Sequence, residues 1–247
     1  MINLVGLLRE TGRQRFASVH AMGARNLAEA AREAGASRFV QISAIGADAG
    51  SPGKYGRTKA EGETAVREVF PGATIIRPSI VFGPEDDFFN RFAQMATISP
   101  ALPLIGGGET KFQPIFVGDL AAAIAAAAAD PVHAGVTYEL GGPAVYSFRE
   151  LMEFILTETG RRRFLAPLPF PVASVMGMAG DVMGLVIPPP VTSDQVQMLK
   201  ADNVPAPGAP GLEAFGLTPR TIEAVVPTYL YRYRRGGQYA AAPEGSY

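Results

Sequence analysis

Apolar positions follow two patterns along the first eighty residues: short continuous runs, and longer stretches with helical spacing. Short apolar runs at 2–6, 38–43 and 73–79 have the length and composition of buried strands. Between them, 15–34 and 54–70 carry apolar residues at helical spacing. The order strand, helix, strand, helix, strand predicts an α/β fold, a Rossmann-like doubly wound parallel sheet with right-handed crossovers.

The pattern is less regular in the rest of the chain. It predicts a helix at 88–97, a strand at 112–117, a helix at 118–130, a strand at 136–142 and a helix at 147–160. Two helix starts carry the spacing of a capping box, at 147–150 and at 192–195. A last helix is expected to begin at the Thr-Pro dipeptide 218–219, with proline at its first position.

These elements suggest a division of the chain. We expect residues 1–142 to form a partial Rossmann domain of the kind that binds NAD(P). Residues 143–235 would form a smaller, α-rich C-terminal lobe, to which 84–112 contribute. Residues 236–247 are rich in Gly, Ala and Pro, which indicates a flexible tail.

The composition excludes several classes of site and partner. The 247 residues are 47% hydrophobic and 18% charged, with a net charge of −1, so no overall field favours nucleic acid or an anionic membrane. The absence of cysteine excludes disulfides, zinc–thiolate sites and iron–sulfur clusters held by the chain itself. With only His20 and His133, we expect no metal site. No uninterrupted apolar run reaches the roughly eighteen residues that a membrane span needs.

One predicted helix carries a Tyr-x-x-x-Lys pair on its buried face. Tyr55, Lys59, Gly62, Val66 and Val69 follow one another at helical spacing and form one continuous stripe. Because the last three are residues that a helix packs against a sheet, we expect the tyrosine and the lysine to point toward the sheet too. They would lie near its C-terminal edge, where open α/β sheets bind ligands.

A lysine on a buried helix face needs a polar partner. A ribose hydroxyl would meet the Lys59 ammonium, and the ammonium would lower the pKa of the Tyr55 phenol. Ser43, at the end of the preceding strand, could hydrogen-bond the same ligand oxygen. Glu63 and Arg67 form an i, i+4 pair suited to the solvent side. The alternative is a solvated lysine beside a tyrosine that only packs.

The stretch after this helix extends the pattern. Ser, Tyr-x-x-x-Lys, a strand and then RPSIVFGPED resemble the extended or atypical short-chain dehydrogenase/reductase family. In that family Tyr, Lys and Ser form the catalytic set, and the Arg-Pro segment lines the nicotinamide. The resemblance implies catalytic roles, if the protein is active, for Tyr55, Lys59 and Ser43. It implies a cofactor site at Gly6, Leu7, Ser43, Tyr55, Lys59, Pro78, Ser79, Ile80 and Val81.

Segments spread over the whole chain resemble a narrower family. INLVGLLRE, QPIFVGDLAAAI, PLPFP, GLEAFGLTP and YLYRYR together look like the nucleotide-binding accessory subunits of respiratory complex I, NADH:ubiquinone oxidoreductase, in their α-proteobacterial form. The resemblance implies a tightly held NADPH, or NAD(H), with a structural rather than a catalytic use. It implies complex I peripheral-arm subunits as partners. It also implies a place in the bacterial cytoplasm, on the cytoplasmic face of the inner membrane.

Two hypotheses of function stay open at this stage. The first is a complex I accessory subunit with a structural or assembly role and a cofactor outside the electron path. The second is an independent NAD(P)-dependent oxidoreductase or epimerase that acts on a sugar or carbonyl substrate. In the second, Tyr55 is the general acid/base, Lys59 tunes it and holds the ribose, and Ser43 orients the substrate.

The phosphate-binding turn of the family is missing from this sequence. Rossmann proteins open with a strand and a G-x-x-G-x-x-G turn whose amides hold the pyrophosphate. This sequence begins instead at a segment that matches the fourth strand of the family. We infer, as a hypothesis, that Met1 is an internal or alternative start and that the sheet is N-terminally truncated. An inert fragment is then a third alternative, and we expect the polypeptide alone to bind a dinucleotide poorly.

Residues 161–190 place three arginines before a long apolar stretch whose one charge is Asp181. One interpretation is a contact surface for a membrane or an apolar partner. The other is an internal strand and a core helix of the second lobe. Prolines in this stretch exclude a spanning helix.

The Tyr/Arg run at 229–235 is interpreted as a docking or solvated helix end, so no nucleic-acid partner is expected.

Overall fold

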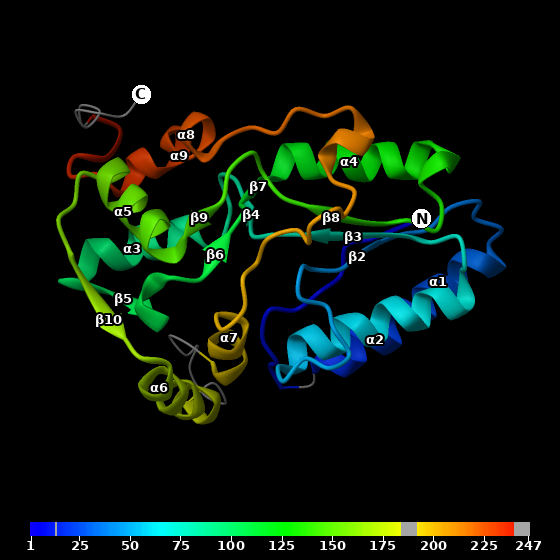
Figure 1. Cartoon of the computed structure of the whole chain (residues 1–247), viewed down its shortest axis with the longest axis horizontal. Coiled ribbons are helices and arrows are strands. Elements are labelled where there is room, and N and C mark those ends of the chain that lie inside the picture. Colours follow the sequence, from blue (N-terminus) through cyan, green and yellow to red (C-terminus); the bar gives the residue numbers. More distant parts are fainter. Residues whose placement is uncertain (13, 184–191, 240–247) are drawn as a thin grey trace.

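A parallel sheet lies at the centre of the N-terminal half of the molecule (Figure 1). The structure is a computed structural model, and it describes residues 1–12, 14–183 and 192–239. All neighbouring strands in this sheet are parallel, which confirms the predicted α/β fold with a Rossmann-like sheet. In spatial order the strands are β1 (Ile2–Asn3), β2 (Val40–Ile42), β3 (Thr74–Pro78) and β8 (Thr137–Leu140).

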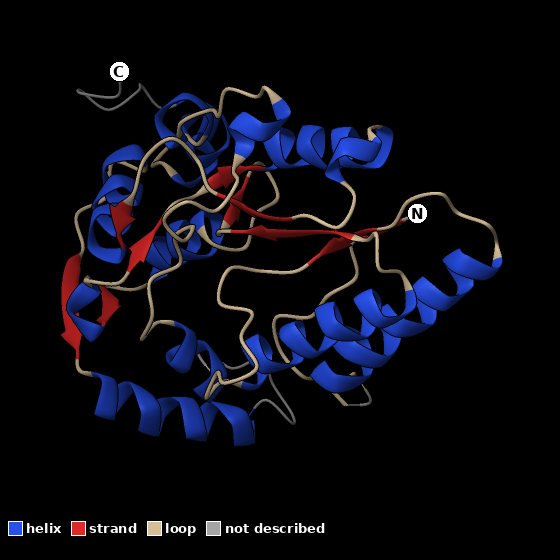
Figure 2. Cartoon of the chain, turned by 45° about the vertical axis from the view of Figure 1, so that its right-hand side comes forward, coloured by secondary structure: helices blue, strands red, loops and turns tan. Residues whose placement is uncertain are grey.

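Helices cover both faces of this sheet. α1 (Ala24–Glu33) and α2 (Lys54–Val69) lie together on one face, and α4 (Val117–Ala129) lies on the other, as Figures 1 and 2 show. Val66 of α2 packs with Phe39 and with buried alanines of α1. Because alanines let two helices approach closely, α1 and α2 form one layer over the sheet.

The buried stripe of α2 meets a helix as well as the sheet. A Cβ added to Gly62 would lie 2.0 Å from the backbone oxygen of His20. His20 belongs to a π-helical segment, Ala17–Gly23, which continues into α1. The prediction that Gly62 packs against the sheet is therefore wrong. Its missing side chain is what allows the two helices to come into backbone contact.

The predicted strand at 112–117 is divided in two. β6 (Lys111–Phe112) pairs with β9 (Tyr146–Ser147), whereas β7 (Ile115–Phe116) pairs with β4 (Val81–Phe82). Pro114 lies between them and has no amide hydrogen to donate to a ladder, so one continuous strand is not formed here.

A second apolar core lies beside the sheet. Its fully buried side chains include Phe89, Leu104 and Leu151. β5 (Ala101–Ile105) and β10 (Phe164–Leu168) run parallel along it. The helices of this core are α3 (Phe89–Ile98), α5 (Phe148–Glu158), α8 (Ile222–Val225) and α9 (Pro227–Leu230).

Capping explains where the later helices begin. Both predicted capping boxes are present, at Ser147 before α5 and at Thr192 before α7 (Ser193–Met198). The last helical region begins after Thr221 rather than at 218–219, because the Thr221 hydroxyl accepts a hydrogen bond from the amide of Ala224. The side-chain cap at Thr221, rather than the Thr-Pro dipeptide, therefore determines where this helix begins.

The segment after α7 returns to the sheet. Leu212 is buried with Ile76 and Leu140, and the amide of Glu139 donates a hydrogen bond to the carbonyl oxygen of Pro210. Residues beyond 142 therefore contribute to the core around the sheet. The division into residues 1–142 and 143–235 stays a prediction, and the described part of the tail ends at residue 239.

Residues 161–183 form a strand and a helix. β10 is followed by α6 (Phe170–Met183), and the remaining positions of the predicted contact surface, 184–191, lie outside the described residues. Within the described ranges, no helix has both the length and the apolar character needed to cross a membrane. In the same ranges, no three His, Asp or Glu side chains gather in a group that could hold a metal ion.

Candidate cofactor and ligand site

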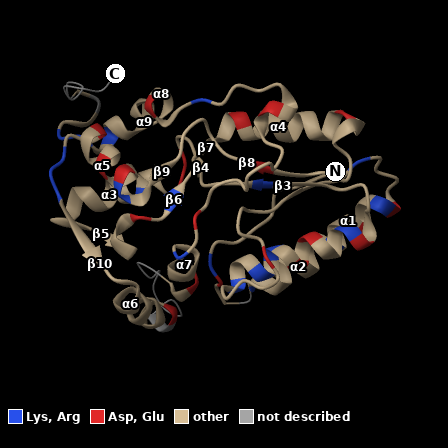
Figure 3. Cartoon of the chain, in the orientation of Figure 1, with Lys and Arg blue, Asp and Glu red and all other residues tan. Residues whose placement is uncertain are grey.

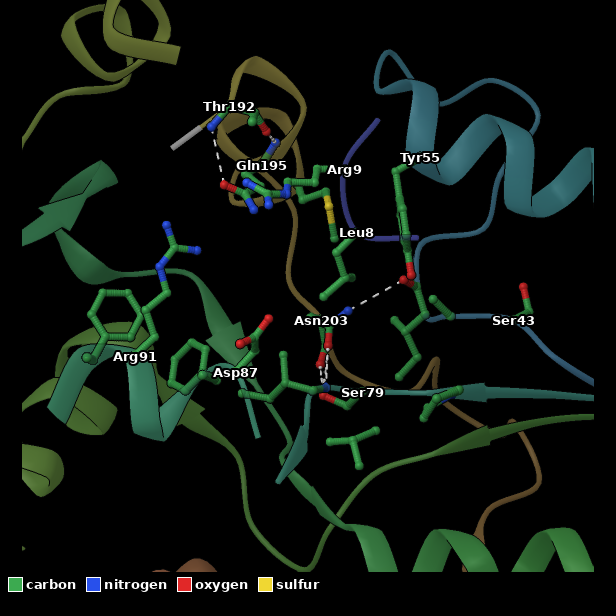
Figure 4. A pocket seen from close by; sticks show the side chains of 18 of the residues that line it. Leu8, Arg9, Ser43, Tyr55, Ser79, Asp87, Arg91, Thr192, Gln195 and Asn203 are labelled. Carbon is green, nitrogen blue, oxygen red and sulfur yellow. Dashed lines mark hydrogen bonds between the residues drawn. The ribbon is translucent and has the colours of Figure 1, made fainter. Parts of the chain in front are cut away.

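A cavity of about 820 Å³ opens at the C-terminal ends of β2 and β3 (Figure 4). We call it the main cavity. Six of the predicted site residues line it, whereas Gly6, Leu7 and Lys59 are not among its lining residues. The lining residues are Leu8, Arg9, Ser43, Ala44, Ile45, Tyr55, Pro78, Ser79, Ile80, Val81, Asp87, Phe88, Arg91, Phe92, Met95, Thr192, Gln195, Met198 and Asn203.

Tyr55 reaches from the first turn of α2 into the main cavity (Figure 4). Its ring makes edge contacts with the rings of Phe16 and His20, with centroid distances of 5.9 and 5.4 Å. Burial, and then the negative charge of Asp194, raise the pKa of Tyr55 to about 12. The prediction that Lys59 lowers this pKa is therefore wrong, because the loss of solvent around the phenol dominates.

Lys59 is turned into the protein. The residue is 7% exposed, and its Nζ donates a hydrogen bond of 3.3 Å to the carbonyl oxygen of Ile42, the last residue of β2. Burial lowers the pKa of Lys59 to about 8, although the charge of Glu63 acts in the opposite direction. Gly6 passes beside the ammonium, since an added Cβ would lie 3.1 Å from Nζ. A solvated Lys59 is thereby excluded.

Ser43 follows β2 and carries an unsatisfied hydroxyl. Its amide donates a hydrogen bond to the carbonyl oxygen of Ile76, which fixes the residue at the sheet edge. Its Oγ is buried and has no hydrogen-bond partner among the described residues. Because a buried unsatisfied polar group costs about 1–3 kcal/mol, such a hydroxyl at the wall of a cavity suits a ligand oxygen.

His20 connects the loop after β1 to α2, and the sequence did not indicate this role. Its Nε2 accepts a hydrogen bond of 3.0 Å from the amide of Leu7, and its Nδ1 lies 3.0 Å from Oγ1 of Thr58. Burial first, and then the charge of Lys59, lower the pKa of His20 to about 4. The imidazole is therefore neutral at pH 7 and fixes Leu7, the neighbour of the lining residue Leu8.

Asp194 caps α2 from a distant part of the chain. Its carboxylate accepts hydrogen bonds from the amides of Lys54 and Tyr55, at 2.6 and 3.1 Å. A negative charge at a helix N-terminus satisfies free amides and interacts favourably with the helix dipole. Asp194 belongs to α7, so this contact holds α7 against the start of α2, where α7 side chains line the main cavity.

The Arg-Pro segment of β3 has two different surroundings. Pro78 lines the main cavity, whereas Arg77 forms ion pairs with Glu63 at 2.6 Å and with Glu139 at 3.1 Å. Glu63 is buried, so the predicted solvent-facing pair of Glu63 and Arg67 is wrong. A carboxylate on the inner side of α2 is stable there because a strand arginine neutralises it.

Asn203 joins the floor of the main cavity to the rest of the molecule. The Ser79 hydroxyl donates to both the backbone and side-chain oxygens of Asn203, at 2.7 and 2.8 Å. The amide of Ile80 donates to the same side-chain oxygen, and the Asn203 Nδ2 donates to the carbonyl oxygen of Ile45. Ser79 and Ile80, predicted as cofactor contacts, are therefore held in place by a residue that no sequence motif marked.

Comparison with known proteins gives a family and several relatives. Residues 9–176 match the family described as the RmlD substrate binding domain. Relatives from Arabidopsis thaliana and Mus musculus, both named NADH dehydrogenase (ubiquinone) 1 alpha subcomplex subunit 9, mitochondrial, are each 38% identical to this chain. The matches cover 96% and 95% of this chain, and 61% and 62% of the relatives. The chain thus spans less than two thirds of their length.

A solved structure supports the fold. MoeE5 in complex with UDP-glucose and NAD matches with a TM-score of 0.62 at 18% sequence identity. The match covers 86% of this chain and 69% of the MoeE5 chain. At this level of identity the likeness concerns the fold, and it agrees with the sheet and flanking helices described above.

Proposed function

The chain belongs to the RmlD substrate binding domain family, and from its relatives we propose that it is an NAD(P)-binding accessory subunit of respiratory complex I. Its role would be structural or in assembly. The observation that carries the proposal is the 38% identity to complex I subunits along nearly the whole chain, the second core included. These relatives confirm the resemblance that the sequence indicated.

The residues at the sheet edge suit the nicotinamide and ribose part of NADPH or NAD(H). The Ser43 hydroxyl is buried without a partner, and Lys59 points inward beside Gly6. In the proposal, Lys59 binds a ribose hydroxyl and Ser43 donates to a ligand oxygen. Leu7, whose amide bonds to His20, holds the neighbouring lining residue Leu8 in place. Bound NADPH or NADH can supply a hydride, but the accessory role makes no use of that chemistry because the cofactor lies outside the electron path.

Tyr55 is a hydrogen-bond donor in this site. With its pKa raised to about 12, it keeps its proton at pH 7. A protonated phenol suits a ligand oxygen in the accessory role and in the enzymatic one. We prefer the accessory role to that of an independent oxidoreductase or epimerase because the relatives at 38% identity are complex I subunits.

We place the docking surface for complex I on β10 and α6. Phe164, Val172, Val175 and Met178 are large apolar side chains that are about half exposed or more. Figure 3 shows the arginines at 161–163 just before β10, and few charges along β10 and α6. Such a surface suits an apolar patch of a peripheral-arm subunit, with the exposed Arg162 toward lipid headgroups. In a bacterium this would hold the protein at the cytoplasmic face of the inner membrane.

Affinity purification from the organism that encodes the chain tests this proposal. We expect a tagged full-length protein to copurify with NADH:quinone oxidoreductase subunits from membranes solubilised in mild detergent. Val175→Asp should reduce that copurification several-fold, because it charges the α6 surface. Val132→Asp is the matched control, since Val132 is also exposed but follows α4 on the other side of the sheet.

Two results would contradict the proposed accessory role. Recovery of the protein free of these subunits would contradict the accessory role. NADPH-dependent turnover of a soluble carbonyl compound, abolished by Tyr55→Phe, would replace it with the enzymatic one.

A further inference from the structure

A second, apolar space adjoins the main cavity. We call it the apolar chamber, and it has a volume of about 260 Å³. It shares eight lining residues with the main cavity: Ile80, Phe88, Arg91, Phe92, Met95, Gln195, Met198 and Asn203. Beyond these shared residues its wall includes Ile105, Leu168 and Met176. The chamber therefore continues the main cavity away from the sheet edge, toward β10 and α6.

The polar groups in the chamber wall are largely occupied within the protein. The Asn203 side chain accepts hydrogen bonds from Ser79 and Ile80 and donates one to Ile45. The Oε1 of Gln195 accepts a hydrogen bond from the amide of Thr192. Arg91 is the one charged side chain among the described residues of this wall. A ligand in the chamber thus meets mainly carbon.

The main cavity offers a different chemistry. The Ser43 hydroxyl is buried without a partner, and the Tyr55 phenol keeps its proton at pH 7. Both groups can donate a hydrogen bond to an uncharged oxygen. The two spaces together therefore suit a molecule that is polar at one end and apolar at the other.

We propose that the apolar chamber binds the aliphatic chain of a single-chain amphiphile whose hydroxyl or carbonyl end lies in the main cavity, toward Ser43 and Tyr55. A nucleotide sugar fits the chamber poorly, because its phosphates need several cations or backbone amides. The proposal goes beyond the accessory role above. It needs neither complex I nor a dinucleotide, so either idea can fail without the other.

A series of 1-alkanols from 1-hexanol to 1-decanol tests the proposal by calorimetric titration of the full 247-residue chain. Burial of one methylene contributes about 0.8 kcal/mol, so affinity should rise roughly fourfold with each added carbon until the chamber is full. UDP-glucose serves as the polar comparison, and we expect it to compete weakly with 1-decanol.

Two methionines of α6 give a matched pair of variants. Met176 lines the chamber and Met178 does not, while the two residues are similarly exposed, at 45% and 56%. Met176→Asp should weaken 1-decanol binding at least tenfold, because it places a charge in an apolar wall, and Met178→Asp should change it less than twofold. Met176→Phe should fill part of the chamber, so the affinity should stop rising at a shorter alkanol than in the unmodified protein. Circular dichroism establishes that each variant is folded.

Three results would overturn the proposal. One is an affinity that does not increase with chain length. Another is an equal loss of binding in Met176→Asp and Met178→Asp. The third is tighter binding of UDP-glucose than of 1-decanol, with the UDP-glucose affinity lost in Met176→Asp, since that would assign the chamber to a nucleotide sugar.

Discussion

Lys59, His20 and Tyr55 form a buried cluster. The pKa of each is shifted in the direction that favours its uncharged form. The pKa is lowered to about 8 at Lys59 and to about 4 at His20, and it is raised to about 12 at Tyr55. Burial is the largest cause in all three. This cluster therefore holds two neutral side chains and one lysine that keeps most of its charge at pH 7.

His20 makes the stability of the fold depend on pH. Its pKa is about 4 in the folded protein, against 6.5 for an unperturbed histidine, so below pH 6.5 the unfolded chain binds the proton more strongly. The free energy of unfolding should fall by about 2 kcal/mol between pH 7 and pH 5 because of this residue. Urea denaturation at both pH values measures it, and His20→Gln should remove most of the difference. An unchanged pH dependence in that variant would contradict the assignment.

The sequence allowed the inward positions of Tyr55 and Lys59 to be predicted, because both lie on one helical stripe. It did not reveal the role of His20. The partner of His20 is a backbone amide thirteen residues away, in a loop without periodicity. The direction of the Tyr55 pKa was also missed, since it depends on burial and on Asp194, which is distant in sequence.

At the scale of the element, α2 shows what local sequence determines. Its extent, Lys54–Val69, agrees closely with the predicted 54–70, because its apolar spacing is local information. The side chain that caps α2 comes from a distant part of the sequence. Gly53 offers no side chain, and the carboxylate of Asp194 satisfies the first amides instead. The same holds for Glu63, whose arginine partner lies on the following strand.

The close contact between α2 and the π-helical segment depends on Gly62. We expect Gly62→Ala to lower the free energy of unfolding by about 1–3 kcal/mol, since the added Cβ would overlap the backbone oxygen of His20. Chemical denaturation measures the change. Gly72→Ala is the control, because a Cβ there meets nothing within 4 Å. Equal stability of the two variants would show that the helices are not in tight contact.

On the scale of the whole molecule, Asn203 holds several segments together. It bonds to Ser79 and Ile80 after β3, and its backbone bonds to Lys111 and Gln113. The parallel sheet could be predicted from the order of strands and helices. The return of the chain after α7 could not, because this segment has no periodic pattern and is fixed by single hydrogen bonds.

Removal of the Asn203 side chain should loosen the junction between the two apolar cores. We expect Asn203→Ala to lower the free energy of unfolding by about 2–3 kcal/mol, because the amide of Ile80 and the hydroxyl of Ser79 lose an acceptor. Asn203→Asp keeps that acceptor but loses the Nδ2 donor to the carbonyl oxygen of Ile45, so it should recover only part of this loss. Thermal and chemical denaturation compare the two, and equal losses would show that the acceptor is unimportant.

The buried position of Lys59 has a consequence for the stability of the protein in the cell. The Lys59 ammonium carries three donors, and one hydrogen bond, to Ile42, is found for it among the described residues. A ligand oxygen would relieve this deficit, so the folded population should grow with ligand concentration. A fall in the concentration of that ligand would then lower the folded fraction and increase its exposure to proteolysis.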